Sequence, residues 1–417
     1  MLDNLLKKKS NSNIKKNYFY LLLIQGTNLV LPLITFPYLV RVLGSEKYGL
    51  VMISYSLMKF FIITVDFGFN ISATREVALL KDNINKLSKF FWNVTIIKLV
   101  LLVITFLILL LLTVSVDKLQ LDPLIYLLSF GLVLGQSIFP TWFFQGIEKM
   151  QVITIINVIA KVFFTITIFF IVLGPKDYYY VPILNGIGFI VTGLLGFLYS
   201  LKYIKIIFPS FQDITNNIKK TFSLFVSNIA VSLYSSTNTL ILGFFIGDSI
   251  AGVYASMEKL ILAIQTMYTP IYQAIFPNLS TKNKMEVKDT IAKMKIPIAL
   301  SGMVISLIIF FGAEIFLRII FDDELISSYF KVFQIIGFMA FLSSLNMLYV
   351  TLYFPAISKY KVRMKILISG GFLNLILALS FVKAFSIYGV ASSAILTEFF
   401  MLLCAFYFYK RTIDDRG

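Results

Sequence analysis

The feature that most restricts how this chain can fold is a series of apolar runs, each about 20 residues long. Residues 91–114 read FWNVTIIKLVLLVITFLILLLLTV, and comparable runs recur along all 417 residues. A helix of about 20 residues crosses the hydrocarbon core of a bilayer, which is about 30 Å thick. The composition agrees, because 58% of the residues are hydrophobic and 14% are charged. The sequence therefore predicts an all-α polytopic membrane protein.

The apolar runs predict about twelve transmembrane helices joined by short loops. The predicted spans are residues 18–40, 48–68, 91–114, 123–145, 151–173, 181–201, 222–246, 250–276, 296–320, 325–352, 364–384 and 387–409. The N-terminal tail carries five lysines and has no small-residue cleavage site, so we expect it to be retained. The predicted organisation is a tail at 1–17, six-helix lobes at 18–210 and 211–409, and a second tail at 410–417.

Lysine and arginine are distributed unevenly between alternate loops. With the N-terminus inside, the inner segments hold 26 of the 37 basic residues and the outer loops hold 5. The positive-inside rule then places both termini in the cytoplasm. This topology also explains most of the net charge of +16. Because the basic residues are scattered over seven short segments, we do not expect the chain to bind nucleic acid.

Several kinds of chemistry are excluded by the residues that the chain lacks. It has no histidine and one cysteine, Cys404, which removes imidazole catalysis, disulfide frameworks and the usual Cys/His metal sites. It also has no glycine-rich phosphate-binding loop, so we do not expect it to hydrolyse ATP. The sequence predicts no metal, no cofactor and no enzymatic activity.

Two short motifs recur at about half the chain length. RVLGSEKYGLV follows the first span and FFIGDSIAGVY follows the seventh, so that Gly44 and Gly49 recur as Gly247 and Gly252, 203 residues later. FFQGIEKMQV after the fourth span is echoed by YFPAISKYKV after the tenth, at an offset of 210 residues. Two matches at nearly equal offsets favour a six-plus-six duplication whose halves run in the same direction.

Three spans carry polar side chains along one face. The stripes are Gln25, Asn28, Pro32 and Thr35 in the first span, Thr154, Asn157, Lys161 and Thr165 in the fifth, and Asn228, Ser232, Ser235 and Thr239, with Asn238 beside them, in the seventh. Spacings of three and four residues place each stripe on one side of a helix. Such stripes either face a polar cavity or join neighbouring helices by hydrogen bonds, and the sequence leaves both alternatives open.

Ionised groups inside a span are more informative than hydroxyls. Lys59 and Lys161 lie about ten residues into their spans, hence roughly 15 Å deep, where an ionised group costs on the order of 3 kcal/mol. We therefore predict that both line a water-filled cavity. Lys98, Lys331 and Arg318 lie nearer to span ends, and we expect them to reach the interface by snorkelling.

The acidic residues suggest two further roles. Glu258 and Lys259 are adjacent, about 100° apart on a helix, so at most one of them points straight into a lumen. Lys259 is a candidate cavity residue, and Glu258 and the deep Glu398 are candidates for ion coupling. Asp66 ends the second span, and Arg75 follows in a basic loop. This pair is predicted to form a state-dependent cytoplasmic gate, with a plain salt bridge or helix cap as the alternative.

Three motifs carry a resemblance to a known family. With FPYLVRVLGSEKYG, DFGFNISATREVA and YGVASSAILTE in this order, the chain resembles the polysaccharide flippases, the O-antigen (Wzx-type) exporters of the multidrug/oligosaccharidyl-lipid/polysaccharide superfamily. The resemblance covers the whole chain in length, span number and motif order. It implies two pseudo-symmetric six-helix lobes around a central cavity. It also implies alternating access, with an undecaprenyl-pyrophosphate-linked oligosaccharide passing from the inner to the outer leaflet of the bacterial inner membrane.

On this resemblance, the expected partners are a lipid-linked oligosaccharide, the phospholipid bilayer, and polymerase and chain-length proteins of lipopolysaccharide biosynthesis. Cationic and polar side chains would replace water around the head group, with no covalent step. One alternative is a cation-coupled drug or metabolite antiporter of the same superfamily, which should keep deep acidic residues in its first lobe. The other is a membrane polymerase or glycosyltransferase, which usually needs a large outer loop that this chain lacks.

Overall fold

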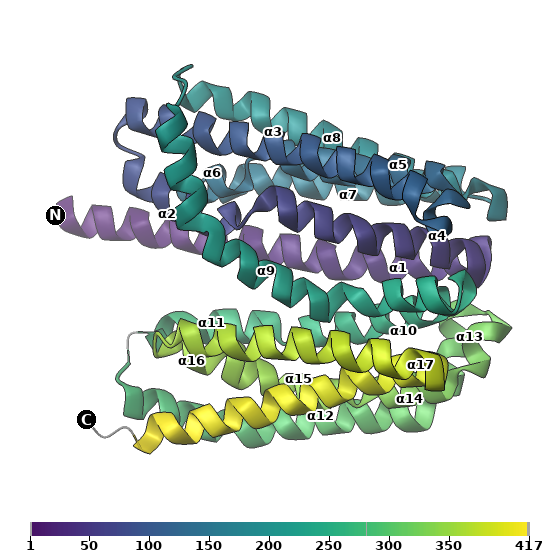
Figure 1. Cartoon of the computed structure of the whole chain (residues 1–417). Coiled ribbons are helices and arrows are strands. Elements are labelled where there is room, and N and C mark those ends of the chain that lie inside the picture. Colours follow the sequence, from purple (N-terminus) through teal and green to yellow (C-terminus); the bar gives the residue numbers. More distant parts are fainter. Residues whose placement is uncertain (1, 281, 415–417) are drawn as a thin grey trace. The chain divides into compact units, whose positions relative to one another are not determined.

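The computed structural model of this chain describes the backbone of residues 2–280 and 282–414. Within these ranges, every regular element is a helix (Figure 1). Side chains are described from residue 26 onward, except at residues 28, 29, 150, 152, 153, 230, 231, 234, 235, 270, 273, 274, 277, 280 and 413–414. The prediction of an all-α protein is confirmed for the described part of the chain.

The helices fall into two series of similar length and order. The first comprises α1 (Leu2–Asp66), α2 (Phe69–Leu80), α3 (Ile84–Ser115), α4 (Asp117–Gln120), α5 (Pro123–Ile138), α6 (Thr141–Gly146), α7 (Met150–Ile171), η1 (Pro175–Tyr179), α8 (Tyr180–Ser200) and η2 (Leu201–Tyr203). The second comprises α9 (Phe211–Phe245), α10 (Asp248–Thr266), α11 (Thr269–Ser280), α12 (Lys284–Phe321), α13 (Glu324–Ser328), α14 (Phe330–Gly337), α15 (Met339–Asn346), η3 (Met347–Tyr353), α16 (Phe354–Ala356) and α17 (Tyr360–Asp414).

Eight stretches in the described part of the chain are long and apolar enough to cross a membrane. They are Val30–Leu80, Ile84–Ser115, Pro123–Gly146, Thr154–Ile171, Pro175–Tyr203, Lys284–Phe321, Phe330–Ala356 and Tyr360–Thr412. The first and the last each cover two predicted spans, because α1 is interrupted at Gly44 and α17 at Ser386. The segments predicted at 222–246 and 250–276 are helical but are not among the eight, so the total of twelve crossings stays a prediction.

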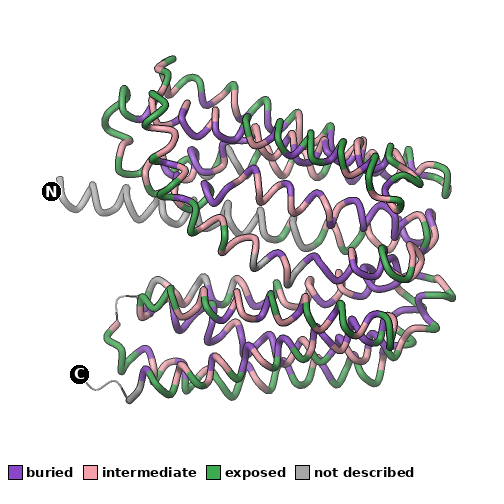
Figure 2. The backbone as a smooth tube through the Cα atoms, in the orientation of Figure 1, coloured by how far each residue is buried: buried purple, intermediate pink, exposed green. Residues whose placement is uncertain are grey.

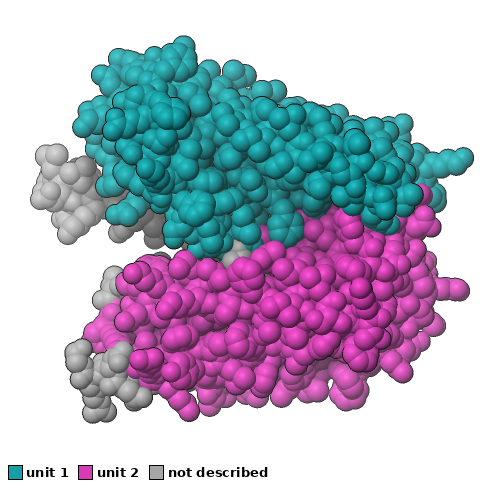
Figure 3. All heavy atoms as spheres, in the orientation of Figure 1, with its two compact units in different colours: residues 1–35, 57–229 teal, residues 36–56, 230–417 magenta. Residues whose placement is uncertain are grey.

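Spatial contacts divide the chain into two compact units, coloured separately in Figure 3. Unit 1 comprises Met1–Thr35 and Leu57–Ile229, and unit 2 comprises Phe36–Ser56 and Ala230–Gly417. The lobe boundary predicted after residue 210 stays a prediction, because the two units divide the chain within α1 and within α9.

The long helices have one buried side and one apolar exposed side. Buried and exposed positions are interspersed along the long helices (Figure 2). In α3, Phe91, Val94 and Leu109 are buried, whereas Val103 and Leu107 are each 58% exposed. Exposed apolar side chains in such numbers would be costly in water but suit contact with lipid tails. The exposed side of α3 is therefore the side expected to meet the bilayer.

Small residues let the helices of unit 1 approach closely, as is common in membrane bundles. A Cβ added to Gly131 of α5 would lie 3.1 Å from the Cα of Gly186 in α8. A Cβ added to Gly135 would lie 2.3 Å from the carbonyl carbon of Phe189. The backbones of α5 and α8 are thus in direct contact. This contact fixes the positions of the side chains that flank it on both helices.

The repeated glycines of the sequence are in contact with each other inside unit 2. A Cβ on Gly49 would lie 1.9 Å from the carbonyl oxygen of Asp248, and one on Gly252 would lie 2.0 Å from that of Ser45. The contact is reciprocal, because Asp248 and Gly252 are the residues that match Ser45 and Gly49 at the offset of 203. A reciprocal contact of this kind is what a pseudo-two-fold relation produces.

The turns that precede these glycines are also repeated. Gly44 has φ 72°, and Gly247, which precedes α10, has φ 136°. Both values lie in the region that favours glycine over residues with a side chain. The two equivalent chain reversals are therefore built with the same residue type.

Two more matched features lie at other helix ends. Asn83 and Asn283 cap α3 and α12, and each side chain accepts a backbone N–H three residues later, at 3.1 and 2.9 Å. Lys149 and Lys359 each donate their backbone N–H to the carbonyl five residues earlier at 2.8 Å. The local structure therefore repeats at offsets of 200 to 210 residues with the same chain direction.

The segment of α1 that belongs to unit 2 is attached to the C-terminal end of α12. The Arg41 guanidinium donates hydrogen bonds to the carbonyl oxygens of Ile319 and Ile320, at 2.7 and 2.9 Å. The last carbonyls of a helix have no partner within the helix, and a cation is favourable at this end. Arg41 thus caps α12.

Candidate functional site

Polar side chains from six helices meet in a cavity of about 260 Å³ inside unit 1. These side chains come from α1, α2, α3, α5, α7 and α8, and Thr141 at the start of α6 adds one more. The polar lining consists of Asp66, Asn70, Lys98, Gln136, Ser137, Thr141, Asn157, Lys161 and Thr192. Ile62, Val65, Val133, Phe139 and Phe189 complete the wall. We refer to this space as the unit 1 cavity.

An ion pair lies at one wall of this cavity. The Lys98 ammonium of α3 is 4.0 Å from a carboxylate oxygen of Asp66, and the two side chains are only 7% and 14% exposed. Removing two charges from water costs several kcal/mol each, so such groups stay buried mainly because they compensate one another. The expectation that Lys98 snorkels is therefore wrong, because its counter-ion lies inside the unit. Lys331 and Arg318 are exposed.

The backbone around Asp66 holds its carboxylate in place. Asp66 is the last residue of α1, and Phe67 (φ 51°) and Gly68 (φ 86°) reverse the chain into α2. Backbone N–H groups of Gly68 and Asn70 face the carboxylate. A Cβ on Gly68 would lie 2.8 Å from the Cβ of Leu224. The turn is thus fixed by left-handed residues and by close packing against α9.

Two members of the polar stripe predicted on the fifth span line the cavity. Asn157 and Lys161 of α7 contribute to its wall, and both side chains are half-buried. Thr154 and Thr165 of the same stripe are buried, 2% and 8% exposed. The striped face of α7 is therefore turned into unit 1, and this is the face on which Lys161 lies.

Sequence reasoning missed most of the other lining residues. Lys98 lies near a span end, and neither Asn70 nor Gln136 belongs to one of the three polar stripes. Their common signal is an amide or an ammonium within an apolar helix, which is a weak signal for any one residue. Asp66 offered the better signal, since a buried carboxylate requires a cation nearby.

Several predicted site residues lie elsewhere. Lys59 of α1 and Asn228 of α9 are half-buried outside the cavity lining, and the side chains of Gln25 and Asn28 lie outside the described residues. Arg75 is exposed on α2. The ion pair seen for Asp66 is the one with Lys98, and the state-dependent gate between Asp66 and Arg75 stays a prediction.

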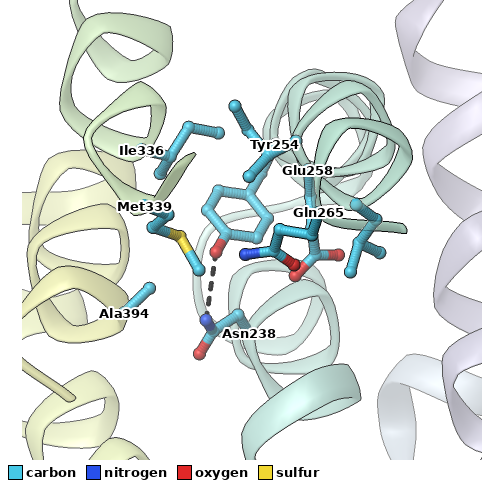
Figure 4. A pocket seen from close by; sticks show the side chains of 9 residues that line it. Asn238, Tyr254, Glu258, Gln265, Ile336, Met339 and Ala394 are labelled. Carbon is cyan, nitrogen blue, oxygen red and sulfur yellow. Dashed lines mark hydrogen bonds between the residues drawn. The ribbon is translucent and has the colours of Figure 1, made fainter. Parts of the chain in front are cut away.

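Unit 2 contains a smaller cavity of about 40 Å³, room for roughly three water molecules (Figure 4). The Asn238 amide donates a hydrogen bond to the Tyr254 hydroxyl at 3.0 Å. Thr239 donates to the Glu258 carboxylate at 3.4 Å. Figure 4 shows the side chains of Glu258 and Gln265 next to each other on one side of the Tyr254 ring. We refer to this space as the unit 2 cavity; its charged group is a carboxylate.

The remaining predicted residues of unit 2 lie outside this cavity lining. The Lys259 ammonium lies 5.3 Å from the centre of the Phe36 ring, a cation–π contact. Glu398 is 4% exposed, and the Asn346 amide donates to both its side chain and its backbone carbonyl. Among the described residues, no group of three or more histidine, cysteine or acidic side chains is placed to hold a metal ion.

Comparisons with known proteins agree with this architecture. The model of the family described as "Polysaccharide biosynthesis protein" matches residues 14–283. Proteins named "Putative O-antigen transporter" from Escherichia coli (strain K12) and Shigella dysenteriae are 31% and 29% identical to this chain. The alignments span 395 and 401 residues, covering 93% and 94% of this chain and 94% and 98% of those proteins.

Solved structures show the same fold at low identity. The structure titled "Lipid II flippase MurJ, inward closed conformation" has a TM-score of 0.76 at 12% identity, covering 94% of this chain and 87% of that one. A multidrug resistance MATE family transporter of the MOP superfamily has a TM-score of 0.64 at 13% identity, covering 93% and 96%. This chain therefore shares the fold of these two transporters.

Proposed function

This chain belongs to the polysaccharide biosynthesis protein family, and on that premise we propose that it is a flippase for a polysaccharide repeat unit. The relatives named as O-antigen transporters align over nearly the full length of the chain. A flippase for lipid II has the same fold. The substrate in this proposal is an undecaprenyl-pyrophosphate-linked oligosaccharide, which moves from the cytoplasmic to the outer leaflet of the bacterial inner membrane.

The observation that carries this proposal is the unit 1 cavity. Amides, hydroxyls and two ammonium groups are gathered inside helices whose outer faces are apolar. A polar head group that leaves water needs replacement hydrogen bonds, and an unmade one costs about 1–3 kcal/mol. The cavity supplies such partners while a prenyl tail can stay in the lipid. No covalent step is needed, so a transporter rather than an enzyme is proposed.

The proposed mechanism is alternating access between two six-helix lobes with twelve crossings and both termini in the cytoplasm. The helix caps repeated in units 1 and 2 and the reciprocal glycine contact inside unit 2 support a duplicated architecture. In this mechanism, Lys59, Asn228, Lys259, Gln25 and Asn28 belong to the substrate path, together with the lining of the two cavities. Polymerase and chain-length proteins would receive the flipped unit on the outer side.

Energy for the cycle is proposed to come from an ion gradient. Glu258 lines the unit 2 cavity, and Glu398 is buried beside Asn346. Intramembrane carboxylates of this kind are the usual carriers of coupled protons. Asp66 is the third candidate, and its ion pair with Lys98 would have to open for it to take up a proton.

The experiment follows the position of lipid-linked repeat units when the gene is removed. Accumulation on the cytoplasmic leaflet, reversed by the wild-type chain, is the expected result. Lys161→Gln should restore export only in part, whereas Lys331→Gln, at an exposed position, should restore it fully. Completed units on the outer leaflet without the gene would contradict the proposal. Unchanged polysaccharide with altered drug resistance would point to an antiporter.

A further inference from the structure

Two lysines and two tyrosines gather on the surface of unit 1, where α7 begins and α8 ends. Lys149 precedes α7, Lys202 follows α8 within η2, and these two helices pack against each other. The Lys149 ammonium lies 2.7 Å from the Tyr203 hydroxyl, and the Lys202 ammonium lies 4.9 Å from the centre of the Tyr199 ring. The centres of the two tyrosine rings are 5.8 Å apart. We refer to these four residues as the basic cluster.

The positive charge of the basic cluster is not balanced by a nearby acidic side chain. Among the described residues, no carboxylate lies within 4.0 Å of the Lys149 or the Lys202 ammonium. Glu148, which precedes Lys149 in the sequence, is paired with Lys81 at 3.1 Å. Both lysines of the cluster are exposed. The cluster therefore offers two positive charges to an anion from outside the described chain.

The hydroxyls of the basic cluster form a chain of donors. The Lys149 ammonium donates to the Tyr203 hydroxyl, which donates to the Tyr199 hydroxyl at 3.2 Å. The Tyr199 hydroxyl is then the last donor, and it has no acceptor among the described residues. The buried rings of Phe143 and Phe144 contact the two tyrosine rings and fix their positions. The end of this chain suits a group that only accepts hydrogen bonds, such as a phosphate oxygen.

An exposed apolar stripe on α8 leads to Lys202. Ile187, Val191, Leu195 and Leu198 are exposed and precede Lys202 by 15, 11, 7 and 4 residues. Steps of three and four residues place these side chains on one face of a helix. The stripe is roughly 17 Å long at 1.5 Å per residue, close to half of the hydrocarbon core of about 30 Å. It therefore has the length of the acyl chains in one leaflet.

We propose that the basic cluster and this stripe together bind one anionic phospholipid, with its phosphate between Lys149, Lys202 and the Tyr199 hydroxyl and its acyl chains along α8. The predicted topology places this end of unit 1 on the cytoplasmic side, where basic residues meet anionic lipids. A free phosphate would leave the stripe unused, and a zwitterionic lipid would bring its own cation towards the two lysines. The inference is independent of the proposed function, because it concerns a lipid on the surface of unit 1.

The equivalent region of unit 2 lacks part of the basic cluster and supplies a matched control. The offset of 210 residues relates Lys149 to Lys359, and both lysines are exposed. The same offset relates Lys202 to Thr412, which is 6% exposed. The Thr412 hydroxyl is hydrogen-bonded to the Tyr353 hydroxyl at 3.0 Å. Lys359→Gln therefore removes an exposed lysine at an equivalent position that has no second lysine to match Lys202.

The test titrates the purified full-length protein with phospholipid and measures the dissociation constant of its tightest lipid site by native mass spectrometry. The probes are phosphatidylglycerol and phosphatidylcholine with identical acyl chains. The wild-type chain should bind phosphatidylglycerol roughly 25-fold more tightly, since each of two lysines at an anionic lipid contributes about fivefold. Lys149→Gln and Lys202→Gln should each reduce this preference about fivefold, and Tyr199→Phe should reduce it about threefold. Lys359→Gln should leave it unchanged.

Equal affinity of the wild-type chain for the two phospholipids would overturn the proposal, whatever the variants do. An unchanged preference in folded Lys149→Gln or Lys202→Gln, or an equal loss in Lys359→Gln, would also overturn it. Displacement of phosphatidylglycerol by inorganic phosphate at the same concentration would assign the cluster to a free anion. Tighter binding of undecaprenyl phosphate, lost in the same variants, would assign it to a prenyl lipid. Either of these last two results would refute a phospholipid site.

Discussion

Units 1 and 2 share their turns and caps but differ in the chemistry of their cavities. The offset of 200 residues that relates Asn83 to Asn283 also relates Asp66 to Thr266 and Lys98 to Ile298. The unit 1 cavity is large and carries two ammonium groups and one carboxylate. The unit 2 cavity is small, and its acidic residue is Glu258.

The same contrast holds for α7 and α17. The offset of 210 that relates Lys149 to Lys359 relates Lys161 to Gly371, so all three charges of the unit 1 cavity are matched by uncharged residues. Backbone geometry is thus kept in both halves, while the interior side chains have diverged. The two cavities therefore differ in their chemistry: two ammonium groups and a carboxylate line the one in unit 1, and one carboxylate lines the one in unit 2.

The largest expected effect comes from removing one charge of the buried pair. Lys98→Met leaves the Asp66 carboxylate buried without a cation, which should lower the free energy of unfolding by about 3–5 kcal/mol. Ile298→Met, at the matched position of unit 2, conserves volume and should cost less than about 1.5 kcal/mol. Unfolding of the purified variants, followed by circular dichroism, measures both. Equal losses would show that the charge difference between the units does not matter for stability.

Double variants separate the ion pair from the predicted gate. Asp66→Lys with Lys98→Asp should recover the stability that each single change loses, because the attraction survives exchange. Asp66→Arg with Arg75→Asp tests the gate through export per molecule of membrane protein. Recovery of export in that double variant would support a state in which Asp66 meets Arg75. Loss of folded protein in both of its singles, with normal export per molecule, would instead identify Asp66 as an anchor.

The glycine contact tests how closely the two turns correspond. Gly49→Ala and Gly252→Ala each place a methyl group about 2 Å from a carbonyl oxygen, and each should cost about 1–3 kcal/mol. Similar losses are expected because the contact is reciprocal. Gly188→Ala is the control, since nothing lies within 4 Å of the added Cβ. Thermal unfolding midpoints compare the three, and a loss confined to one glycine would argue against a reciprocal contact.

The sequence predicted the helices and the repeat better than the contents of the cavity. Apolar runs and glycine spacing are local properties of the sequence. The helical segments and the matched turns at Gly44 and Gly247 could therefore be predicted from the sequence alone. The stripe on α7 pointed to Asn157 and Lys161 for the same reason. The partner of Asp66 could not be read, because Lys98 follows 32 residues later on another helix. Pairing between helices depends on how they pack, which no spacing rule along one chain supplies.

A smaller effect is expected at the matched helix caps. Asn83→Ala and Asn283→Ala each remove one side-chain acceptor from an exposed helix start. Each change should lower the free energy of unfolding by about 1 kcal/mol. Asn83→Asp and Asn283→Asp keep the acceptor and should be neutral. Denaturant midpoints of the four variants test whether the two caps are equivalent. If one cap could be removed without loss of stability, the caps at Asn83 and Asn283 would not be equivalent.

The smallest effect concerns an exposed ion pair of unit 1, which contrasts with the buried one. Lys89 lies 2.7 Å from Asp213, which also accepts from Ser210 at the start of α9. Hydrogen bonds from Lys89 and then Ser210 lower the pKa of Asp213 from 3.8 to about 2. A carboxylate with a lowered pKa stabilises the fold fully above its unfolded value and loses that contribution as pH falls through about 2. Lys89→Met should therefore weaken the acid dependence of the unfolding midpoint between pH 5 and pH 2, and about 1 M salt should abolish the difference from wild type. Lys89→Met could instead lose as much stability as Lys98→Met, or lose stability that does not depend on salt. Either result would mean that solvent exposure does not explain the difference in strength between the Lys89–Asp213 and Lys98–Asp66 pairs.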